Sequence, residues 1–133
     1  FNRLHFGGHD LAACADFALL QAVHEQARHS SLAVRVAHVF STDCFYDGDA
    51  NILPLLARHH ICGIEMESAG LYGVAMRENI QALSVLTMTD HLQRDEHMAA
   101  DQREHGLARM AELALESLLR REDEAQDSGR TKA

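Results

Sequence analysis

Two glutamates flank a methionine in the segment GIEMESAG, residues 63–70, at the end of a hydrophobic run. In an extended chain Glu65 and Glu67 share one face, about 7 Å apart, so both carboxylates could reach one ligand. A carboxylate accepts two charge-assisted hydrogen bonds at once, which matches the two hydroxyls of a vicinal diol. The alternative is structural, because Glu67 would also lie favourably near the positive end of a following helix. The spacing leaves both interpretations open.

Asp90 ends the most hydrophobic segment of the chain, QALSVLTMTD. At a junction between a strand and a helix, an aspartate commonly caps the helix that follows. A carboxyl group at a hydrophobic boundary can also have a raised pKa, which would let it donate a proton. A cation such as Arg103, on the next predicted helix, would instead favour the ionised form. Capping is the more common role, and proton donation is the functional alternative.

The histidines and cysteines form no recognisable metal or nucleophile motif. His24 and His29 are five residues apart, about 140° around a helix, so they cannot share a metal ion. No cysteine and histidine spacing matches a zinc site. The sequence also lacks a GxSxG turn and a glycine-rich phosphate loop. We therefore expect no metal site and surface positions for most histidines.

Alternating helical and strand patterns must position the candidate residues. The patterns predict helices over residues 10–29, 52–59, 67–79 and 99–120. Valine-rich or unbroken apolar runs predict strands over residues 32–41, 61–66 and 81–90. Strands that alternate with helices indicate an α/β protein with helices on both faces of a mostly parallel sheet.

Polar or aromatic residues follow each of the three predicted strands, in the segments STDCFYDG, EMES and TDH. Ligands of parallel sheets bind beyond the carboxyl ends of the strands. We therefore expect the functional site at these three strand ends.

Composition and charge restrict the class of protein. The 133 residues are 47% hydrophobic and 24% charged, which indicates one globular domain. A net charge of -8 argues against nucleic acid as a partner, since phosphate contacts need clustered lysine and arginine. Three cysteines in apolar surroundings are typical of reduced thiols, so we expect a cytoplasmic protein. No apolar run reaches the roughly 20 residues of a membrane-spanning helix, and no signal-peptide pattern is present.

Five segments occur in this order along the chain: RLHFGGHDLAACADF, FSTDCFYDGD, GIEMESAGLYGVA, TMTDH and ADQREHGLARMAELALESLL. Together they resemble the C-terminal half of the bacterial hexameric, low-molecular-mass purine nucleoside phosphorylase family. The resemblance covers residues 1–119 and implies the three-layer α/β/α phosphorylase/nucleosidase fold, with a mostly parallel or mixed sheet that is incomplete here. We expect residues 1–120 to form this half-domain and the charged residues 121–133 to form a disordered tail.

The resemblance implies a binding role for four residues. In that family the residue matching Phe45 packs against the purine base, and the residues matching Glu65 and Met66 lie along the nucleoside pocket. The residue matching Glu67 binds the ribose hydroxyls. These implied roles agree with the diol chemistry that the two glutamates could perform.

The resemblance also implies the chemistry. The match to Asp90 is the general acid that protonates the purine at N7, and the match to Arg103 assists it. Protonation makes the purine a better leaving group, and phosphate then attacks the sugar to give ribose 1-phosphate. Phosphate is thus a co-substrate, no cofactor is implied, and the family assembles as a homo-oligomer, a hexamer.

One departure from the family concerns phosphate binding. The family's phosphate ligands, a glycine-rich loop and several arginines, come from its N-terminal half, which has no counterpart in these 133 residues. Because the chain also begins with Phe1 instead of methionine, we expect a fragment that is inactive in phosphorolysis by itself. The alternatives are a purine nucleosidase of the same fold, which uses water, and a non-catalytic truncated remnant.

Overall fold

The computed structural model describes residues 2–44, 51–92, 94 and 96–130, and of residues 124–130 the backbone alone. The chain divides into two compact units. The first unit comprises Phe1–Asp16 and Arg35–Ser84, and the second comprises Phe17–Val34 and Val85–Ala133. No helix in the described part of the chain has the length and hydrophobicity needed to cross a membrane.

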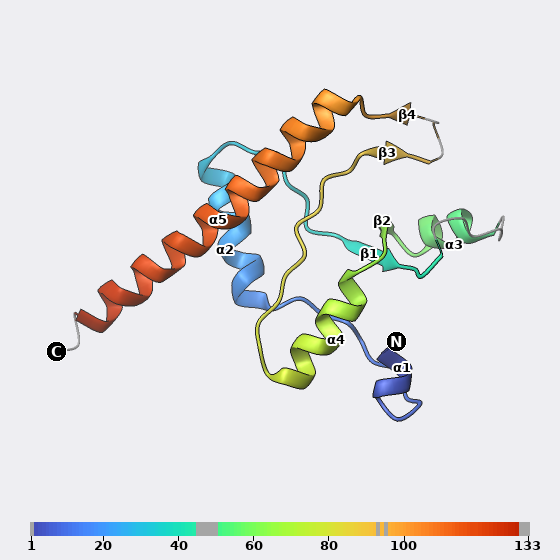
Figure 1. Ribbon diagram of the computed structural model, residues 1–133, viewed down its shortest axis with the longest axis horizontal. Helices are drawn as coiled ribbons and strands as arrows, with labels where there is room; N and C mark the ends of the chain where they lie inside the picture. Colours follow the sequence, from blue (N-terminus) through green and yellow to red (C-terminus); the bar gives the residue numbers. More distant parts are fainter. Residues whose placement is uncertain (1, 45–50, 93, 95, 131–133) are drawn as a thin grey trace. The chain divides into compact units, whose positions relative to one another are not determined.

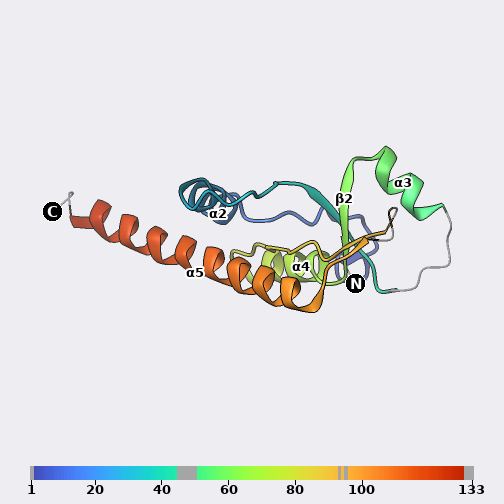
Figure 2. The same cartoon turned by 90° about the horizontal axis from the view of Figure 1, so that it is seen from above.

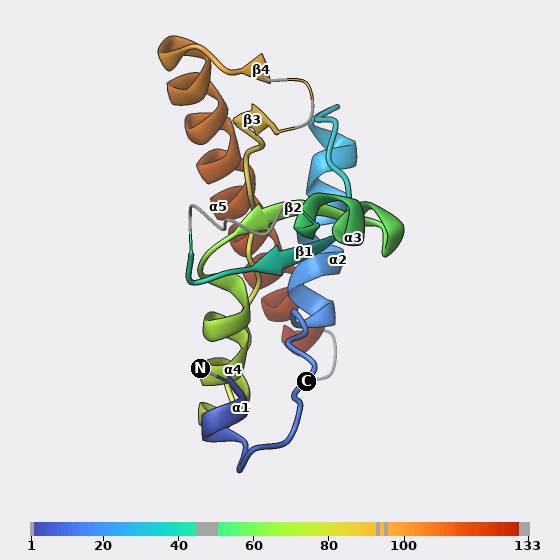
Figure 3. The same ribbon diagram turned by 90° about the vertical axis from the view of Figure 1, so that its right-hand side faces the viewer.

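The first unit is built around two parallel strands, β1 (His38–Ser41) and β2 (Ile61–Glu65) (Figure 3). Helix α3 (Ile52–Arg58) lies between them in sequence and leads into β2 (Figure 2). The last residues of the two strands, Ser41 and Glu65, are partners in the register. Parallel pairing therefore brings both carboxyl ends to the same place, as the sequence predicts.

Helix α4 (Ser68–Glu78) follows β2 directly, close to the predicted bounds of residues 67–79. It ends at Asn79, which adopts the left-handed conformation with a φ of 53°, as asparagine does at helix ends. Helix α1 (Asn2–His5) lies against α4, where the Asn2 side chain donates a hydrogen bond to the carbonyl oxygen of Ala69 at 2.7 Å. A Cβ atom at Gly73 would collide with that side chain, so this glycine permits the close approach.

The second unit contains helices α2 (Phe17–His29) and α5 (Ala100–Arg130), which lie side by side (Figure 1). Ala27 on α2 and Leu113 on α5 are buried, with exposed fractions of 0% and 3%. Polar contacts join the same two helices, including the hydrogen bond that Gln26 donates to Glu116 at 2.8 Å. Two short antiparallel strands, β3 (Asp90–His91) and β4 (Glu96–His97), precede α5.

Two predicted strands are longer than the observed ones. Of residues 32–41 only His38–Ser41 form a strand, and of residues 81–90 only Asp90 does. Residues 81–89 pair with no strand of the described chain, and Leu86 and Met88 are 45% and 57% exposed. An apolar run becomes a strand only when another strand is available to complete its hydrogen bonds.

The helix bounds also differ at two places. Helix α2 begins at Phe17 and not near Asp10, and α5 continues to Arg130 where a disordered tail was expected after Arg120. Glutamate, alanine, arginine and glutamine favour helix, which explains how a polar segment can extend α5 without a hydrophobic face. The α/β class is confirmed, with a parallel pair, a separate antiparallel pair and an incomplete sheet.

Candidate functional site

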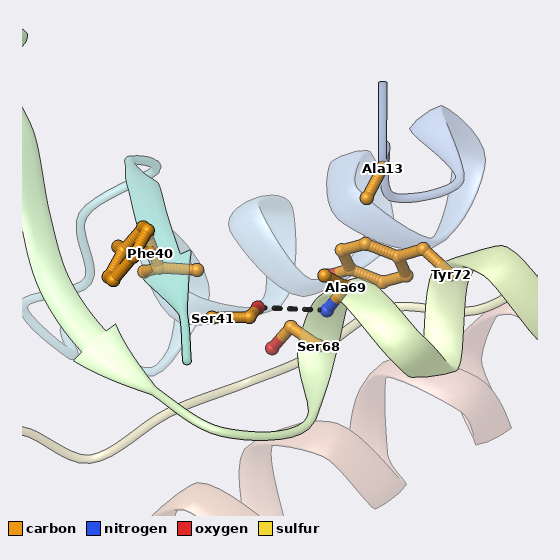
Figure 4. Close-up of a pocket in the computed structure, with 7 residues that line it drawn as sticks. Ala13, Phe40, Ser41, Ser68, Ala69 and Tyr72 are labelled. Carbon is orange, nitrogen blue, oxygen red and sulfur yellow. Dashed lines mark hydrogen bonds between the residues drawn. The ribbon is translucent and has the colours of Figure 1, made fainter. Parts of the chain in front are cut away.

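Glu65 caps helix α4 together with Ser41 from the neighbouring strand. Oε2 of Glu65 accepts hydrogen bonds from the backbone N–H groups of Glu67 at 2.9 Å and Ser68 at 2.6 Å. The Ser41 hydroxyl donates a hydrogen bond to Oε1 of Glu65. It also accepts one from the N–H of Ala69 at 2.9 Å (Figure 4). N–H groups at the start of a helix have no partner within the helix. The two side chains therefore satisfy three of these groups.

The capping bonds determine the charge of Glu65. Partial burial raises the pKa of this carboxyl group, but the hydrogen bonds outweigh burial and the pKa is lowered from its ordinary value. The bonds come from the hydroxyl of Ser41 and from the N–H groups of Ser68 and Glu67. Hydrogen bonds donated to a carboxylate favour its ionised form. Glu65 is therefore a carboxylate at the positive end of the α4 dipole.

Glu67 lies immediately before α4, but its side chain makes no capping hydrogen bond. Its carboxylate is exposed and accepts a hydrogen bond from the N–H of Met66 at 3.3 Å. Met66 is itself 39% exposed. Glu67 thus lies at the positive end of α4, as the structural alternative expects, while Glu65 makes the capping bonds. The carboxylate of Glu67 is accessible to a ligand.

A cavity of about 240 Å³ lies between the end of β1 and the first turns of α4 (Figure 4). It is lined by Ala13, Val39, Phe40, Ser41, Ser68, Ala69 and Tyr72. The Tyr72 hydroxyl accepts a hydrogen bond from the N–H of Ser84 at 2.9 Å, which fixes the ring. Met66 and Glu67 are not among the described residues that line it, so this cavity does not include the exposed carboxylate of Glu67.

Asp90 belongs to the second unit and lies in β3, opposite His97 of β4. Its Oδ2 accepts a hydrogen bond from the Thr89 hydroxyl at 2.6 Å, and its Oδ1 lies 2.7 Å from Nδ1 of His97. These two hydrogen bonds, and to a smaller extent the charges of His97 and Arg103, lower the pKa of Asp90. Arg103 is exposed in the first turns of α5.

Two expectations for Asp90 are corrected by this geometry. It caps no helix, because a hairpin follows it and α5 begins ten residues later, at Ala100. Its pKa is lowered and not raised, because its neighbours donate hydrogen bonds to the ionised form. Of the two opposing influences considered from the sequence, the one that favours the carboxylate prevails.

The structure groups the predicted site residues in two sets. Glu65, Met66 and Glu67 adjoin one another after β2, and Asp90 and Arg103 interact in the second unit. Phe45 lies outside the described residues. Among the described residues, no group of three or more histidine, cysteine, aspartate and glutamate side chains could hold a metal ion.

Sequence reasoning missed three polar residues that contact the site. Ser41 shares the cap of α4, and Thr89 and His97 bind the carboxylate of Asp90. Ser41 stood within the segment STDCFYDG, at a predicted strand end, so parallel pairing with β2 was a usable signal. His97 had no comparable signal, because the hairpin that carries it was not predicted.

Comparison with known proteins identifies the family. Residues 4–121 match the model of the phosphorylase superfamily. Purine nucleoside phosphorylase DeoD-type 1 of Photobacterium profundum is 41% identical over 118 residues, which are 89% of this chain and 49% of that protein. The DeoD-type 2 proteins of Vibrio parahaemolyticus and Aliivibrio fischeri are 41% and 40% identical, over 89% and 90% of this chain and 50% of each relative.

The chain thus spans about half the length of the curated relatives that it matches. The family match nevertheless extends over most of the 133 residues, from α1 into the second half of α5. It includes both sets of candidate site residues, which lie between residues 65 and 103. This chain belongs to the phosphorylase superfamily.

Proposed function

We propose that this chain supplies the nucleoside-binding and proton-donating part of a purine nucleoside phosphorylase. The observation that carries the proposal is the arrangement after β2, where the Glu65 cap leaves the carboxylate of Glu67 exposed at the positive end of α4. The names of the relatives, all purine nucleoside phosphorylases, support the same activity. We assign residues 1–120 to this part of the phosphorylase domain.

Glu67 binds the ribose in this proposal. Its exposed carboxylate can accept hydrogen bonds from both hydroxyls of the sugar at once. Glu65 cannot do this as well, because its oxygens already accept bonds from Ser41, Glu67 and Ser68. Met66 and Phe45 contribute apolar contacts to the nucleoside, and Phe45 packs on the base.

Asp90 donates the proton that the purine takes up at N7. A protonated purine leaves more easily as the glycosidic bond breaks, and phosphate then attacks the sugar to give ribose 1-phosphate. Arg103 contributes an attractive electrostatic interaction with Asp90 and assists it. Phosphate is the co-substrate in this proposal, and we assign its ligands to the half of the protein that this chain lacks, as the family resemblance implies. We further propose a cytoplasmic homo-oligomer, a hexamer as the resemblance implies.

The test is purine release from inosine. The 133-residue chain is assayed alone and after mixing with the N-terminal half of the Photobacterium profundum relative, each with and without phosphate. We expect negligible release by the chain alone and phosphate-dependent release by the mixture, called the reconstituted protein below. Release without phosphate would favour a nucleosidase. Robust release by the isolated chain would refute the proposed division of the site, and no binding of inosine by calorimetry would favour a non-catalytic remnant.

A matched pair of variants tests the ribose role. Glu67→Gln removes the charge from the proposed ribose ligand, and Glu78→Gln makes the same change at the opposite end of α4. Because a charge-assisted hydrogen bond contributes about 1.5–3 kcal/mol, we expect Glu67→Gln to lower kcat/KM of the reconstituted protein about 10- to 100-fold. Equal activities of the two variants would contradict the assignment of Glu67.

A further inference from the structure

A histidine lies directly opposite Asp90 in the β3–β4 hairpin. The N–H of Met98 donates to the carbonyl oxygen of Thr89 at 2.8 Å, so the next pair along the ladder, Asp90 and His97, is a non-hydrogen-bonded pair. Side chains approach most closely in such pairs. The 2.7 Å separation between Nδ1 of His97 and Oδ1 of Asp90 is therefore a consequence of the register.

The surroundings of this pair contain charges of both signs. Among the described residues, the other titratable and charged side chains on these elements include His91 on β3, Glu96 on β4, Arg94 in the hairpin, and Asp101, Arg103 and Glu104 at the start of α5. Glu96 forms an ion pair with Arg94 at 3.3 Å. Arg103 attracts the carboxylate of Asp90. These neighbours thus favour a charged Asp90.

An ionised Asp90 has no proton to give. The lowered pKa of Asp90 means that its carboxyl group is ionised at neutral pH. Of the two side chains that hydrogen bond to it, the Thr89 hydroxyl is not acidic, whereas a histidine gains and loses a proton near neutral pH. His97 is also 64% exposed, so it can take up protons from water.

We propose that His97 is a positioning residue that holds Asp90 and supplies it with the proton that Asp90 passes to the purine. The inference rests on the proposed function, because it needs Asp90 as the proton donor. The step begins with the His97 imidazolium and the Asp90 carboxylate. One proton moves from Nδ1 of His97 to Asp90, and Asp90 gives one proton to N7 of the purine.

The electron pair of the breaking glycosidic bond goes to the purine ring, which leaves with the added proton. At the end of the step His97 is neutral and Asp90 is again a carboxylate, so one proton in total has passed from His97 to the purine. His97 is then protonated from solvent. Activity that depends on this supply must fall as the pH rises through the range in which His97 loses its proton.

Three variants of the reconstituted protein test the proposal. His97→Asn keeps an N–H donor near the position of Nδ1 but cannot titrate, and His97→Ala removes both properties. His105→Asn is the matched control, since His105 is an exposed histidine on α5 whose Nδ1 lies 2.7 Å from the carbonyl oxygen of Asp101. The measurement is kcat/KM for inosine between about pH 5.5 and 8.5.

We expect the unmodified protein and His105→Asn to lose activity as the pH rises, with the same midpoint. His97→Asn should no longer show that midpoint. Its kcat/KM at acid pH should be at least about tenfold lower than that of the unmodified protein, because proton donation by a side chain contributes about 10²- to 10⁴-fold. His97→Ala should be at least as impaired. An unchanged pH profile in His97→Asn would overturn the inference.

Asp90→Asn separates failure of this inference from failure of the proposed function. Full activity of Asp90→Asn would remove Asp90 as the proton donor, and the role of His97 with it. Loss of activity in Asp90→Asn, together with an unchanged pH profile in His97→Asn, would overturn the role of His97 alone.

Carboxyl NMR of the 133-residue chain adds a readout that is independent of activity. His97→Ala should raise the pH midpoint at which Asp90 titrates, because it removes a hydrogen-bond donor to the carboxylate. An unchanged midpoint would overturn the pairing of His97 with Asp90.

Discussion

Replacing Glu65 with alanine should lower the free energy of unfolding of the first unit by about 1–2 kcal/mol. Loss of a capping side chain costs about 1 kcal/mol, and loss of a negative charge at the positive end of a helix costs a further 0.3–1 kcal/mol or so. Glu65 supplies both, since its carboxylate accepts the N–H groups of Glu67 and Ser68 at the start of α4. Urea denaturation, followed by circular dichroism at about 222 nm, measures this difference in the free energy of unfolding.

The control variant is Glu78→Ala, which removes the same type of side chain from the last residue of α4. Glu78 is paired with Arg77 at 2.7 Å on the surface, and about half of each side chain is exposed. Exposed pairs of this kind contribute little, so the expected cost is below about 0.5 kcal/mol. Equal costs for the two alanine variants would refute the capping argument.

The dependence on pH provides a second check of the same reasoning. The pKa of Glu65 is lowered in the folded chain relative to its ordinary value of 4.5. Its charge therefore stabilises the folded state above pH 4.5, and this contribution is lost as the pH falls through the lower, folded-state pKa. The difference in stability between the unmodified chain and Glu65→Gln should be complete at about pH 7 and shrink below about pH 4. A difference that does not depend on pH would contradict the charge-based part of the argument.

Three further changes test the packing around the site. Leu113→Ala should destabilise the α2–α5 pair by about 2–3 kcal/mol, because Leu113 is 3% exposed, whereas Leu115→Ala, at 62% exposure, should cost below about 0.5 kcal/mol by urea denaturation. Ser41→Ala removes the acceptor for the Ala69 N–H and a donor to Glu65, so we expect a loss of about 1 kcal/mol and a higher pKa of Glu65 by carboxyl NMR. Tyr72→Phe deletes the acceptor of a hydrogen bond and should cost about 1 kcal/mol by thermal unfolding, with a loss of amide-exchange protection next to it.

Local sequence patterns predicted α3, α4 and β2 well and the two long apolar strands poorly. The bounds of α3 and α4 agree with the predicted ones within a residue or so, because helical hydrogen bonds are made within the segment itself. The predicted strand over residues 81–90 failed because its hydrogen bonds require another strand, and a sequence pattern does not supply one. The hairpin that carries His97 was missed for a related reason, since no Asn-Gly or Asp-Gly turn marks it.

The sequence located the carboxylates of the site but could not assign their roles. The types and spacing of Glu65 and Glu67 pointed to the end of β2, which is where they lie. Which of the two folds back onto α4 depends on Ser41, a residue of β1 that is distant in sequence and adjacent only through the parallel register. The charge of Asp90 depends in the same way on His97, across the hairpin. Contacts between segments therefore decide what residue types alone leave open.

The different environments of the two glutamates make their roles separable by experiment. The oxygens of Glu65 are occupied by donors from β1 and α4, so its removal should lower stability and, by loosening the backbone at Glu67, also lower activity. Glu67 is exposed and makes no capping bond, so Glu67→Gln should lower the free energy of unfolding only by the charge contribution at the helix start, about 0.3–1 kcal/mol, while it lowers kcat/KM. Urea denaturation and the inosine assay, each applied to Glu65→Ala and Glu67→Gln, distinguish the two roles. A large loss of stability in Glu67→Gln would mean that both carboxylates hold the helix start, and the exposed ligand for a ribose would then have to be sought elsewhere.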